Sequence, residues 1–173
     1  MLRNRRIGCS VSGVAQFITK NGMGELQNWL ETGYDTIQKW DNQYSDWFAV
    51  PKSIKTTSVK PSGTVSLLVG ATPGMHYPES RFYIRRMRLS KHSELLEPLK
   101  KANYPLEPAF GSEDTTMVVE VPVDVGEGIR TAAELSIWEQ FSLAAFLQRH
   151  WADNQVSCTA TFDPKTESEQ LPH

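Results

Sequence analysis

The sequence predicts an α/β fold, and three observations support that prediction. Short runs rich in β-branched residues, at 53–59 and 115–123, have the composition of strands. A long stretch at 24–48 repeats apolar residues at helical spacing, and proline and glycine separate these segments. At 173 residues the chain is long enough to bury one core, so we expect a single domain over 1–173.

Two helices are predicted near the start of the chain. Ser12 and Gly13 can begin the first, and Asn21-Gly22 can end it. The second covers 24–48, with Gly33 as a candidate break between two shorter helices. Its apolar positions favour core packing, or contact with a neighbour, over a stacking surface for bases or a corrin ring; they are Leu26, Trp29, Leu30, Tyr34, Ile37, Trp40, Tyr44, Trp47 and Phe48.

The basic segment 80–101 is typical of a solvated face, and it could also hold polyphosphate or pair with acidic groups. Within it, 93–102 is predicted to form a short helix. The strand at 115–123 carries Pro122, which indicates its end or a sheet edge.

Thr131 and Glu134 fit a capping box that would begin the next helix. The apolar face predicted for that helix consists of Ile137, Trp138, Phe141, Ala144 and Ala145. A strand at 156–162 follows, and Asp163-Pro164 is typical of a further helix start. Because the sequence ends a few residues later, we expect a partial domain, truncated at both ends.

Composition excludes several function classes. The net charge of −2 gives no general attraction to nucleic acid or membranes, and no apolar run approaches the roughly 20 residues that span a bilayer. No signal peptide is recognisable, so a cytoplasmic location is expected. Cys9 and Cys158 lie far apart, and the four histidines are scattered, so no metal site is predicted. Both cysteines are interpreted as small buried residues.

The stretch with the most specific chemistry is 60–74, KPSGTVSLLVGATPG. Pro61 fixes its backbone, Gly63 permits close approach, and Ser62, Thr64 and Ser66 supply hydroxyl donors, so the loop can cradle a phosphate. The apolar run 65–69 could open a helix, whose N–H groups would face the same anion, or a second buried strand. A capped turn without any ligand explains the same residues. The patterns of nucleoside-triphosphatase and dinucleotide-binding loops are absent from the sequence.

Three segments, in order, resemble the ribonucleotide reductase family and most closely its adenosylcobalamin-dependent class II enzymes. They are NRRIGCSVSGVAQFI at 4–18, KPSGTVSLLVGATPGMHYPESRFYIRRMRL at 60–89 and HWADNQVSCTATFDP at 150–164. The resemblance implies the C-terminal part of a ten-stranded α/β barrel of the type shared with glycyl-radical enzymes. It also implies a structural ion-pair role for Arg85-Arg86.

That resemblance carries an expected function for the parent protein. Such an enzyme reduces ribonucleoside triphosphates by thiyl-radical chemistry, with adenosylcobalamin as cofactor and a thioredoxin-type reductant. The positions that match the family's substrate phosphate loop are Ser62, Gly63, Thr64, Val65 and Ser66. The finger-loop motif Asn-x-Cys-x-Glu and the C-terminal cysteine pair do not occur in this sequence, so no catalytic residue is assigned and the chain alone is expected to be inactive.

Two other interpretations stay open at the level of the sequence. The chain could be a non-catalytic nucleotide- or phosphate-binding module that keeps the loop without the reductase chemistry. It could also be an unrelated α/β domain in which the loop is only a capped turn. Nucleotide binding without reductase activity favours the first, and the absence of nucleotide binding favours the second.

Overall fold

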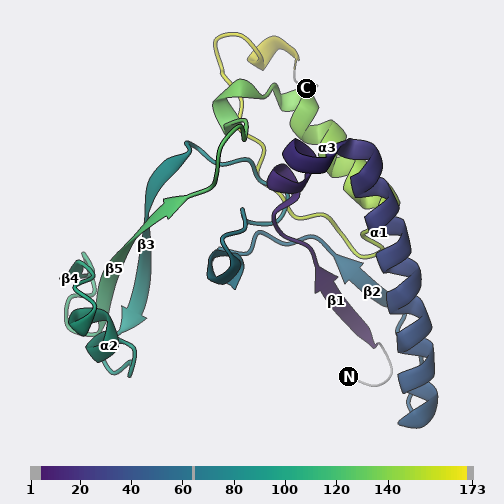
Figure 1. Ribbon diagram of the computed structural model, residues 1–173, viewed down its shortest axis with the longest axis horizontal. Coiled ribbons are helices and arrows are strands. Elements are labelled where there is room, and N and C mark those ends of the chain that lie inside the picture. Colours follow the sequence, from purple (N-terminus) through teal and green to yellow (C-terminus); the bar gives the residue numbers. More distant parts are fainter. Residues whose placement is uncertain (1–4, 64, 171–173) are drawn as a thin grey trace. The chain divides into compact units, whose positions relative to one another are not determined.

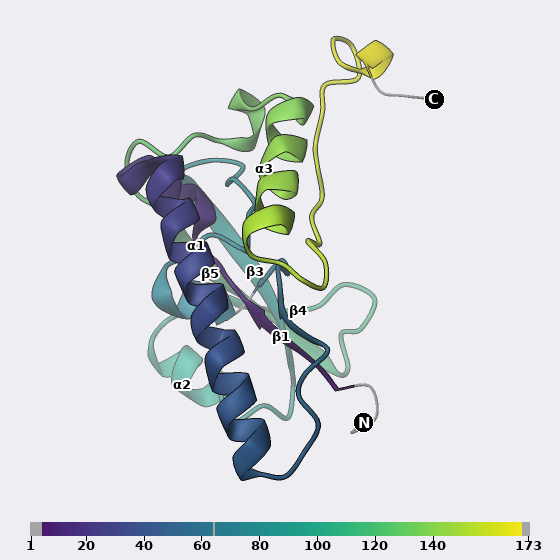
Figure 2. The same cartoon turned by 90° about the vertical axis from the view of Figure 1, so that its right-hand side faces the viewer.

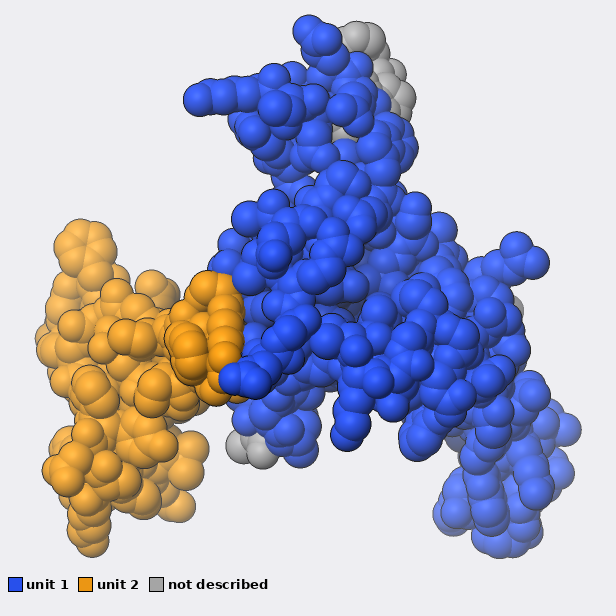
Figure 3. Space-filling model, turned by 45° about the horizontal axis from the view of Figure 1, so that its top comes forward, with its two compact units in different colours: residues 1–79, 125–173 blue, residues 80–124 orange. Residues whose placement is uncertain are grey.

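The computed structural model describes residues 5–63 and 65–170, apart from the side chain of Leu68. It divides into two compact units, which Figure 3 shows in different colours. Unit 1 comprises residues 1–79 and 125–173, and unit 2 comprises residues 80–124. The predicted α/β class is confirmed, since both kinds of element are present and the long helix connects two strands.

Unit 1 begins with a strand–helix–strand arrangement (Figure 1). Strand β1 (Arg6–Ser10) pairs in parallel with β2 (Lys55–Ser58), and helix α1 (Val14–Trp47) connects them. Parallel neighbours need such a crossover because a tight turn cannot join them. The sequence analysis predicted β2 but not β1. All five residues of β1 are exposed, and they include an arginine and a glycine, so the segment lacks the β-branched composition of a strand.

The predicted boundary between two N-terminal helices at Asn21-Gly22 is confirmed, because α1 consists of two helical segments joined by a kink at Gly22. Gly22 lies inside α1 with φ 82° and ψ 169°, a backbone conformation that interrupts the helix without ending it. The candidate break at Gly33 is wrong, because α1 continues through that residue. Gly33 has a packing role instead, since a Cβ there would lie 3.2 Å from the Trp151 ring.

The core of unit 1 forms where α1 and α3 (Ile137–His150) lie side by side (Figures 1 and 2). Leu26 and Leu30 of α1 share this core with Leu143 and Leu147 of α3. The predicted face of α3 is confirmed at Ile137 and at the partly buried Ala144, and it is wrong at Trp138, Phe141 and Ala145. Its buried residues are Ile137, Leu143 and Leu147, whereas Trp138 and Phe141 are exposed.

Helix α3 begins one motif later than predicted. The capping box of Thr131 and Glu134 is present, but it caps the N-terminus of the short 3₁₀ helix η3 (Ala132–Glu134) and not that of α3. A second box, Ser136 with Glu139, begins α3 itself. The hydrogen bond and ion pair from Arg130, with a backbone hydrogen bond from Ser136, lower the pKa of Glu139 to about 2, so the cap is ionised at neutral pH.

After α3 the chain returns along β2 without forming the strand predicted at 156–162. Only Val156 makes an isolated parallel bridge, with Val59. The helix predicted after Asp163 is also reduced to turns and the short 3₁₀ helix η4 (Ser168–Gln170). Asp163 still acts as an N-terminal cap, because its carboxylate accepts a hydrogen bond from the Lys165 N–H.

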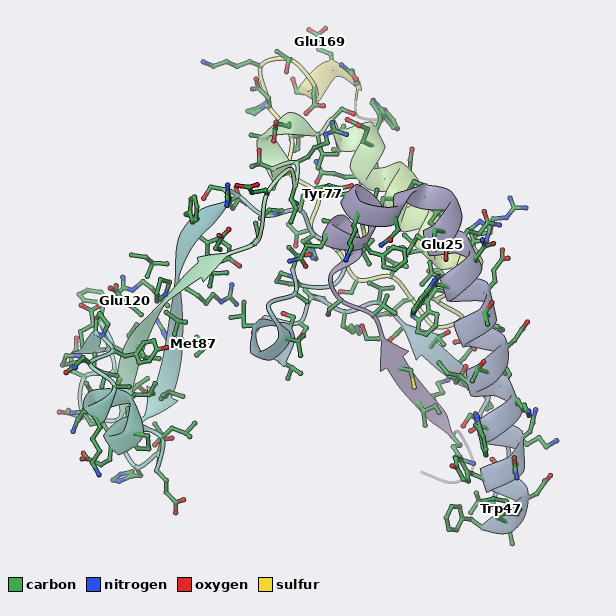
Figure 4. All side chains as sticks on the ribbon, in the orientation of Figure 1. Glu25, Trp47, Tyr77, Met87, Glu120 and Glu169 are labelled. Atoms are coloured by element: carbon green, nitrogen blue, oxygen red, sulfur yellow. The ribbon has the colours of Figure 1, made fainter. Side chains whose placement is uncertain are left out.

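Unit 2 is an antiparallel sheet in the order β3-β5-β4 with one short helix. Strand β3 (Phe82–Ser90) pairs with β5 (Thr116–Asp124) over nine residues, β4 (Leu106–Pro108) pairs with the middle of β5, and α2 is Leu96–Lys101. In Figure 4, Met87 and Glu120 mark β3 and β5.

The basic segment is thus largely a strand, and Arg86 forms ion pairs with Glu107 and Glu120. Pro122 lies beyond the reach of β4, in agreement with the predicted edge.

Several residues that the sequence analysis assigned to the core lie at the surface. Cys9 and Cys158 are both exposed, so their interpretation as buried residues is wrong. The aromatic stripe of α1 is core only in part, because Trp29 and Trp47 remain 65% exposed, the latter near the end of the helix in Figure 4. In the described residues, no helix combines the length and the hydropathy needed to cross a membrane.

Candidate phosphate loop

The loop at 60–74 follows directly from the buried strand β2. Thr56 and Thr57 are fully buried in that strand, and Val59 is equally buried where the loop begins. Buried hydroxyl and backbone groups need hydrogen-bond partners. The hydrogen bonds that these groups of β2 make fix the position at which the loop begins.

Asp153 supplies most of those partners. Its carboxylate accepts hydrogen bonds from the backbone N–H of Thr57 at 2.8 Å and of Thr56 at 3.1 Å, and from both threonine hydroxyls. Burial opposes ionisation of this carboxyl, but the four hydrogen bonds outweigh it and hold the pKa of Asp153 below its ordinary value. The ionised Asp153 carboxylate thus holds strand β2 in place directly before the loop.

The residues around Asp153 extend this attachment along the strand. The Trp151 indole N–H donates to the Ser58 carbonyl at 2.9 Å. The Thr57 hydroxyl shares its single hydrogen between the Asp153 carboxylate and the Trp151 carbonyl, whose oxygen lies 2.5 Å away. The Val59 N–H donates to the Gln155 carbonyl, and the Ser157 N–H donates to the Val59 carbonyl. Segment 151–157 therefore satisfies β2 on one side as a neighbouring strand would.

Inside the loop, two of the predicted residues bond to each other. The Ser66 N–H donates to the Ser62 hydroxyl at 3.1 Å, and the Ser66 hydroxyl donates to the Ser62 carbonyl. Ser66 is buried, whereas Ser62 and Gly63 are half-buried and Val65 is exposed. Thr64 lies outside the described residues. The run after it is the 3₁₀ helix η2 (Val65–Val69), so of the two alternatives that the sequence left open, a helix is present and a buried strand is not.

Two donors of the loop have no acceptor among the described residues, the Gly63 N–H and the Ser62 hydroxyl. Within the part of the chain that the structure describes, the Gly63 N–H has no hydrogen-bond partner. The Ser62 hydroxyl accepts a hydrogen bond from Ser66, so its own hydrogen is available to donate. A neutral N–H and a hydroxyl on adjacent residues are suited to a phosphate oxygen.

The end of the loop returns to the start of α1. The Gly13 N–H donates to the Thr72 carbonyl at 2.8 Å, and the Val14 N–H to the Gly74 carbonyl at 3.3 Å. Gly74 has φ 54°, and a Cβ there would lie 2.6 Å from the Lys60 carbonyl oxygen, so the two ends of the loop meet where only glycine fits. Among the described residues, the buried Thr72 hydroxyl is without a hydrogen-bond partner.

Gln16 makes a further attachment from the first turn of α1. Its side-chain oxygen accepts a hydrogen bond from the Thr72 N–H at 2.8 Å. Its side-chain nitrogen donates to the carbonyls of Gly70, at 2.8 Å, and Val125, at 3.0 Å. One amide group thus connects the helix, the loop and the segment that follows unit 2 in sequence.

Both ring nitrogens of His76 lie within hydrogen-bond distance of backbone groups. Its Nδ1 lies 3.0 Å from the Pro73 carbonyl, and its Nε2 accepts a hydrogen bond from the Thr159 N–H. It lines a cavity of about 140 Å³ that also includes Tyr77 and Cys158. In the described residues, no group of three or more histidine, cysteine, aspartate or glutamate side chains could hold a metal ion.

The sequence therefore located the loop but missed the residues that hold it in place. Asp153 and Gln16 are ordinary polar residues in sequence, and each contacts backbone more than 50 residues away. One signal was available for Asp153, because consecutive threonines in a buried strand require a polar partner. No local pattern distinguishes Gln16.

Comparison with known proteins provides independent evidence. The chain is 59% identical over its whole length to a probable adenosylcobalamin-dependent ribonucleoside-triphosphate reductase of Dictyostelium discoideum. It is 60% identical over 171 residues to an adenosylcobalamin-dependent ribonucleoside-triphosphate reductase of Euglena gracilis. It spans about a quarter of the length of each, 23% and 24%. No family model matches the chain.

The fold agrees with the sequence comparison. A crystal structure of a B12-dependent, class II ribonucleotide reductase superposes with a TM-score of 0.77 at 35% identity, over 98% of this chain and 27% of that one. The resemblance to the ribonucleotide reductase family is thereby confirmed. More narrowly, residues 1–173 correspond to a segment of its adenosylcobalamin-dependent class II members.

Proposed function

We propose that residues 1–173 serve as the substrate phosphate-binding segment of a class II ribonucleoside-triphosphate reductase. In this proposal the segment contributes to a single ten-stranded catalytic barrel, and the parent protein makes deoxyribonucleotides in the cytoplasm with a thioredoxin-type reductant. The names of the relatives support the reaction and the triphosphate substrate. The arrangement of the loop supports this segment's part in it.

The observation that carries the proposal is the pair of available donors at Ser62 and Gly63. They lie on a loop whose two ends are fixed, by Asp153 at the start and by Gly13 and Gly74 at the return. A loop held in this way binds an anion without first having to be ordered, so the free energy of binding is not spent on ordering it. Ser66 braces the loop from within by its bonds to Ser62.

The loop would act by position rather than by chemistry. Holding the triphosphate fixes the ribose relative to reacting groups that belong to other parts of the reductase, and such fixation accounts for a large share of many enzymatic rates. Adenosylcobalamin supplies the radical chemistry when bound. We assign no residue of this chain to that cofactor.

The test places residues 1–173 in the corresponding segment of the Euglena relative and changes Ser62→Ala together with Ser66→Ala. We expect KM for the ribonucleoside triphosphate to rise by roughly tenfold or more, because losing the Ser62 hydroxyl, a donor to a charged group, costs about 1.5 to 3 kcal/mol. Losing the Ser66 hydroxyl removes its bond to the Ser62 carbonyl, which braces the loop. Ser142→Ala, an exposed serine of α3, is the control. An unchanged KM in the double variant would remove the phosphate-binding claim.

The same chimera addresses the non-catalytic alternative. If it binds the nucleotide but fails to reduce it, while the unaltered Euglena protein does both, this segment is a binding module without a place in the reaction. If it neither binds nor reduces, the loop is only a capped turn. Reduction with an ordinary KM supports the proposal.

A further inference from the structure

We propose that Gln16 is a positioning residue for the phosphate loop, an inference that rests on the function proposed above. Gln16 lies on the first turn of α1 and does not belong to the loop. It uses both amide hydrogens and its oxygen on backbone groups, namely the Gly70 carbonyl, the Val125 carbonyl and the Thr72 N–H. A primary amide with both donors and its acceptor engaged on backbone can orient a loop rather than merely fill space.

The attachment lies one hydrogen bond away from the loop's own bracing. Gly70 and Thr72 flank Ala71, whose N–H donates to the Ser66 carbonyl at 2.9 Å. Ser66 in turn bonds to Ser62 through its N–H and its hydroxyl. A displacement at Gly70 would therefore reach the donors at Ser62 and Gly63 through two consecutive contacts.

The fold does not depend on Gln16 alone. Two backbone bonds, from the Gly13 N–H to the Thr72 carbonyl and from the Val14 N–H to the Gly74 carbonyl, do not involve the glutamine side chain. These two bonds keep the loop's return attached to the helix start. The Gln16 side chain holds the backbone at Gly70 and Thr72, which lies between that attachment and η2. Its role is therefore to position this part of the loop.

The experiment uses Gln16→Leu in the same chimera with the Euglena relative, and the probes are a ribonucleoside triphosphate and inorganic tripolyphosphate. We expect KM to rise roughly tenfold, the size of effect that lost hydrogen bonds produce, with kcat within about twofold. The inhibition constant of tripolyphosphate should rise by the same factor as KM. A residue that only stabilised the fold would lower the amount of active enzyme and leave both constants unchanged.

Two further variants sharpen the test. Gln16→Glu keeps the shape and places an oxygen against the carbonyls of Gly70 and Val125, so it should raise KM at least as much as Gln16→Leu. It also keeps the test decisive if the leucine variant does not fold. Gln140→Leu is the matched control, because Gln140 also bonds to backbone with both ends of its amide, at Thr161 and Ser136. KM should not change in that control.

The outcomes separate this inference from the proposed function. If Ser62→Ala with Ser66→Ala raises KM but Gln16→Leu and Gln16→Glu do not, the positioning role is wrong and the phosphate loop stands. If tripolyphosphate fails to compete even with unaltered loop residues, the proposed function itself is wrong. A rise in KM for Gln140→Leu equal to that for Gln16→Leu would also overturn the positioning role.

Discussion

The two units of this chain obtain their order from different sources. In unit 1, the strand that leads into the loop is bonded to a carboxylate 96 residues away, and the loop's return is bonded to the start of α1. In unit 2, β3 and β5 are held by an unbroken antiparallel ladder between nearby segments, and every second residue of β3 is exposed. Unit 1 therefore depends on a few distant side chains, whereas unit 2 depends on repeated backbone pairing.

This difference indicates where a single substitution can move the candidate site. A ladder of many equivalent bonds tolerates the loss of one side chain, but a buried strand end with one carboxylate partner does not. The comparison can be measured within one molecule. The five tryptophans, Trp29, Trp40, Trp47, Trp138 and Trp151, all lie in unit 1, so tryptophan fluorescence reports on that unit alone.

The largest expected effect is at the point where the two ends of the loop meet. Gly74→Ala combines a left-handed backbone with a Cβ at 2.6 Å from the Lys60 carbonyl oxygen, and that oxygen belongs to rigid backbone. We expect a loss of about 3 to 4 kcal/mol in the free energy of unfolding of unit 1. Urea unfolding followed by tryptophan fluorescence measures it.

Gly70→Ala is the matched control for that substitution. Gly70 has a similar φ of 66°, but no atom of the described residues lies within 4 Å of a Cβ built there. Only the backbone strain remains, so the cost should be about 1 kcal/mol. Equal losses in the two variants would show that the close approach to Lys60 does not hold the loop ends together.

The next effect concerns the carboxylate that holds β2. Asp153→Ala leaves the buried N–H groups of Thr56 and Thr57 without their acceptor, and we expect unit 1 to lose about 2 to 3 kcal/mol. Asp35→Ala, an exposed aspartate of α1, should change the free energy of unfolding by less than about 0.5 kcal/mol. The same fluorescence measurement compares the two, and similar losses would refute the special role of Asp153.

The pH dependence of Asp153 has a defined sign. Its pKa is lowered in the folded state from an ordinary value of 3.8, so the folded carboxyl stays ionised under conditions where the unfolded one is protonated. Its contribution is fully present above pH 3.8 and is lost as the pH falls through the lower, folded pKa. In Asp153→Ala, the acid limb of the stability profile should be shallower than in the unaltered chain.

The sequence predicted those elements that the composition and periodicity of their own residues determine. The periodicity of 24–48 and the β-branched run at 115–123 each identified the right element, because neighbouring residues carry the information. The phosphate-binding role of the motif at 60–74 stays a prediction. The α/β class followed from their alternation. The family resemblance rested on the same kind of contiguous motif, and the comparisons confirmed it.

The errors occurred where tertiary contacts decide the outcome. The 156–162 run has strand composition, yet only Val156 pairs, because the segment follows β2 through the bonds around Asp153 instead of forming a ladder. The face of α3 was predicted from Trp138 and Phe141, but packing against Leu26 and Leu30 selects Leu143 and Leu147. Gln16 could not be found, since nothing in its neighbourhood indicates a bond to Gly70.

The smallest effect is expected in unit 2. Arg86 pairs with Glu107 and Glu120, but the three side chains are between 32% and 56% exposed, so water screens their attraction. Arg86→Ala should slow or speed amide exchange in β3 and β5 by no more than about fivefold, which corresponds to about 1 kcal/mol, and should leave tryptophan unfolding unchanged. Lys100→Ala, which removes the exposed pair with Glu97, is the control. If Arg86→Ala instead destabilised unit 1 as much as Asp153→Ala does, the two units would not be stabilised independently, and the contrast between distant side chains and local ladder would fail.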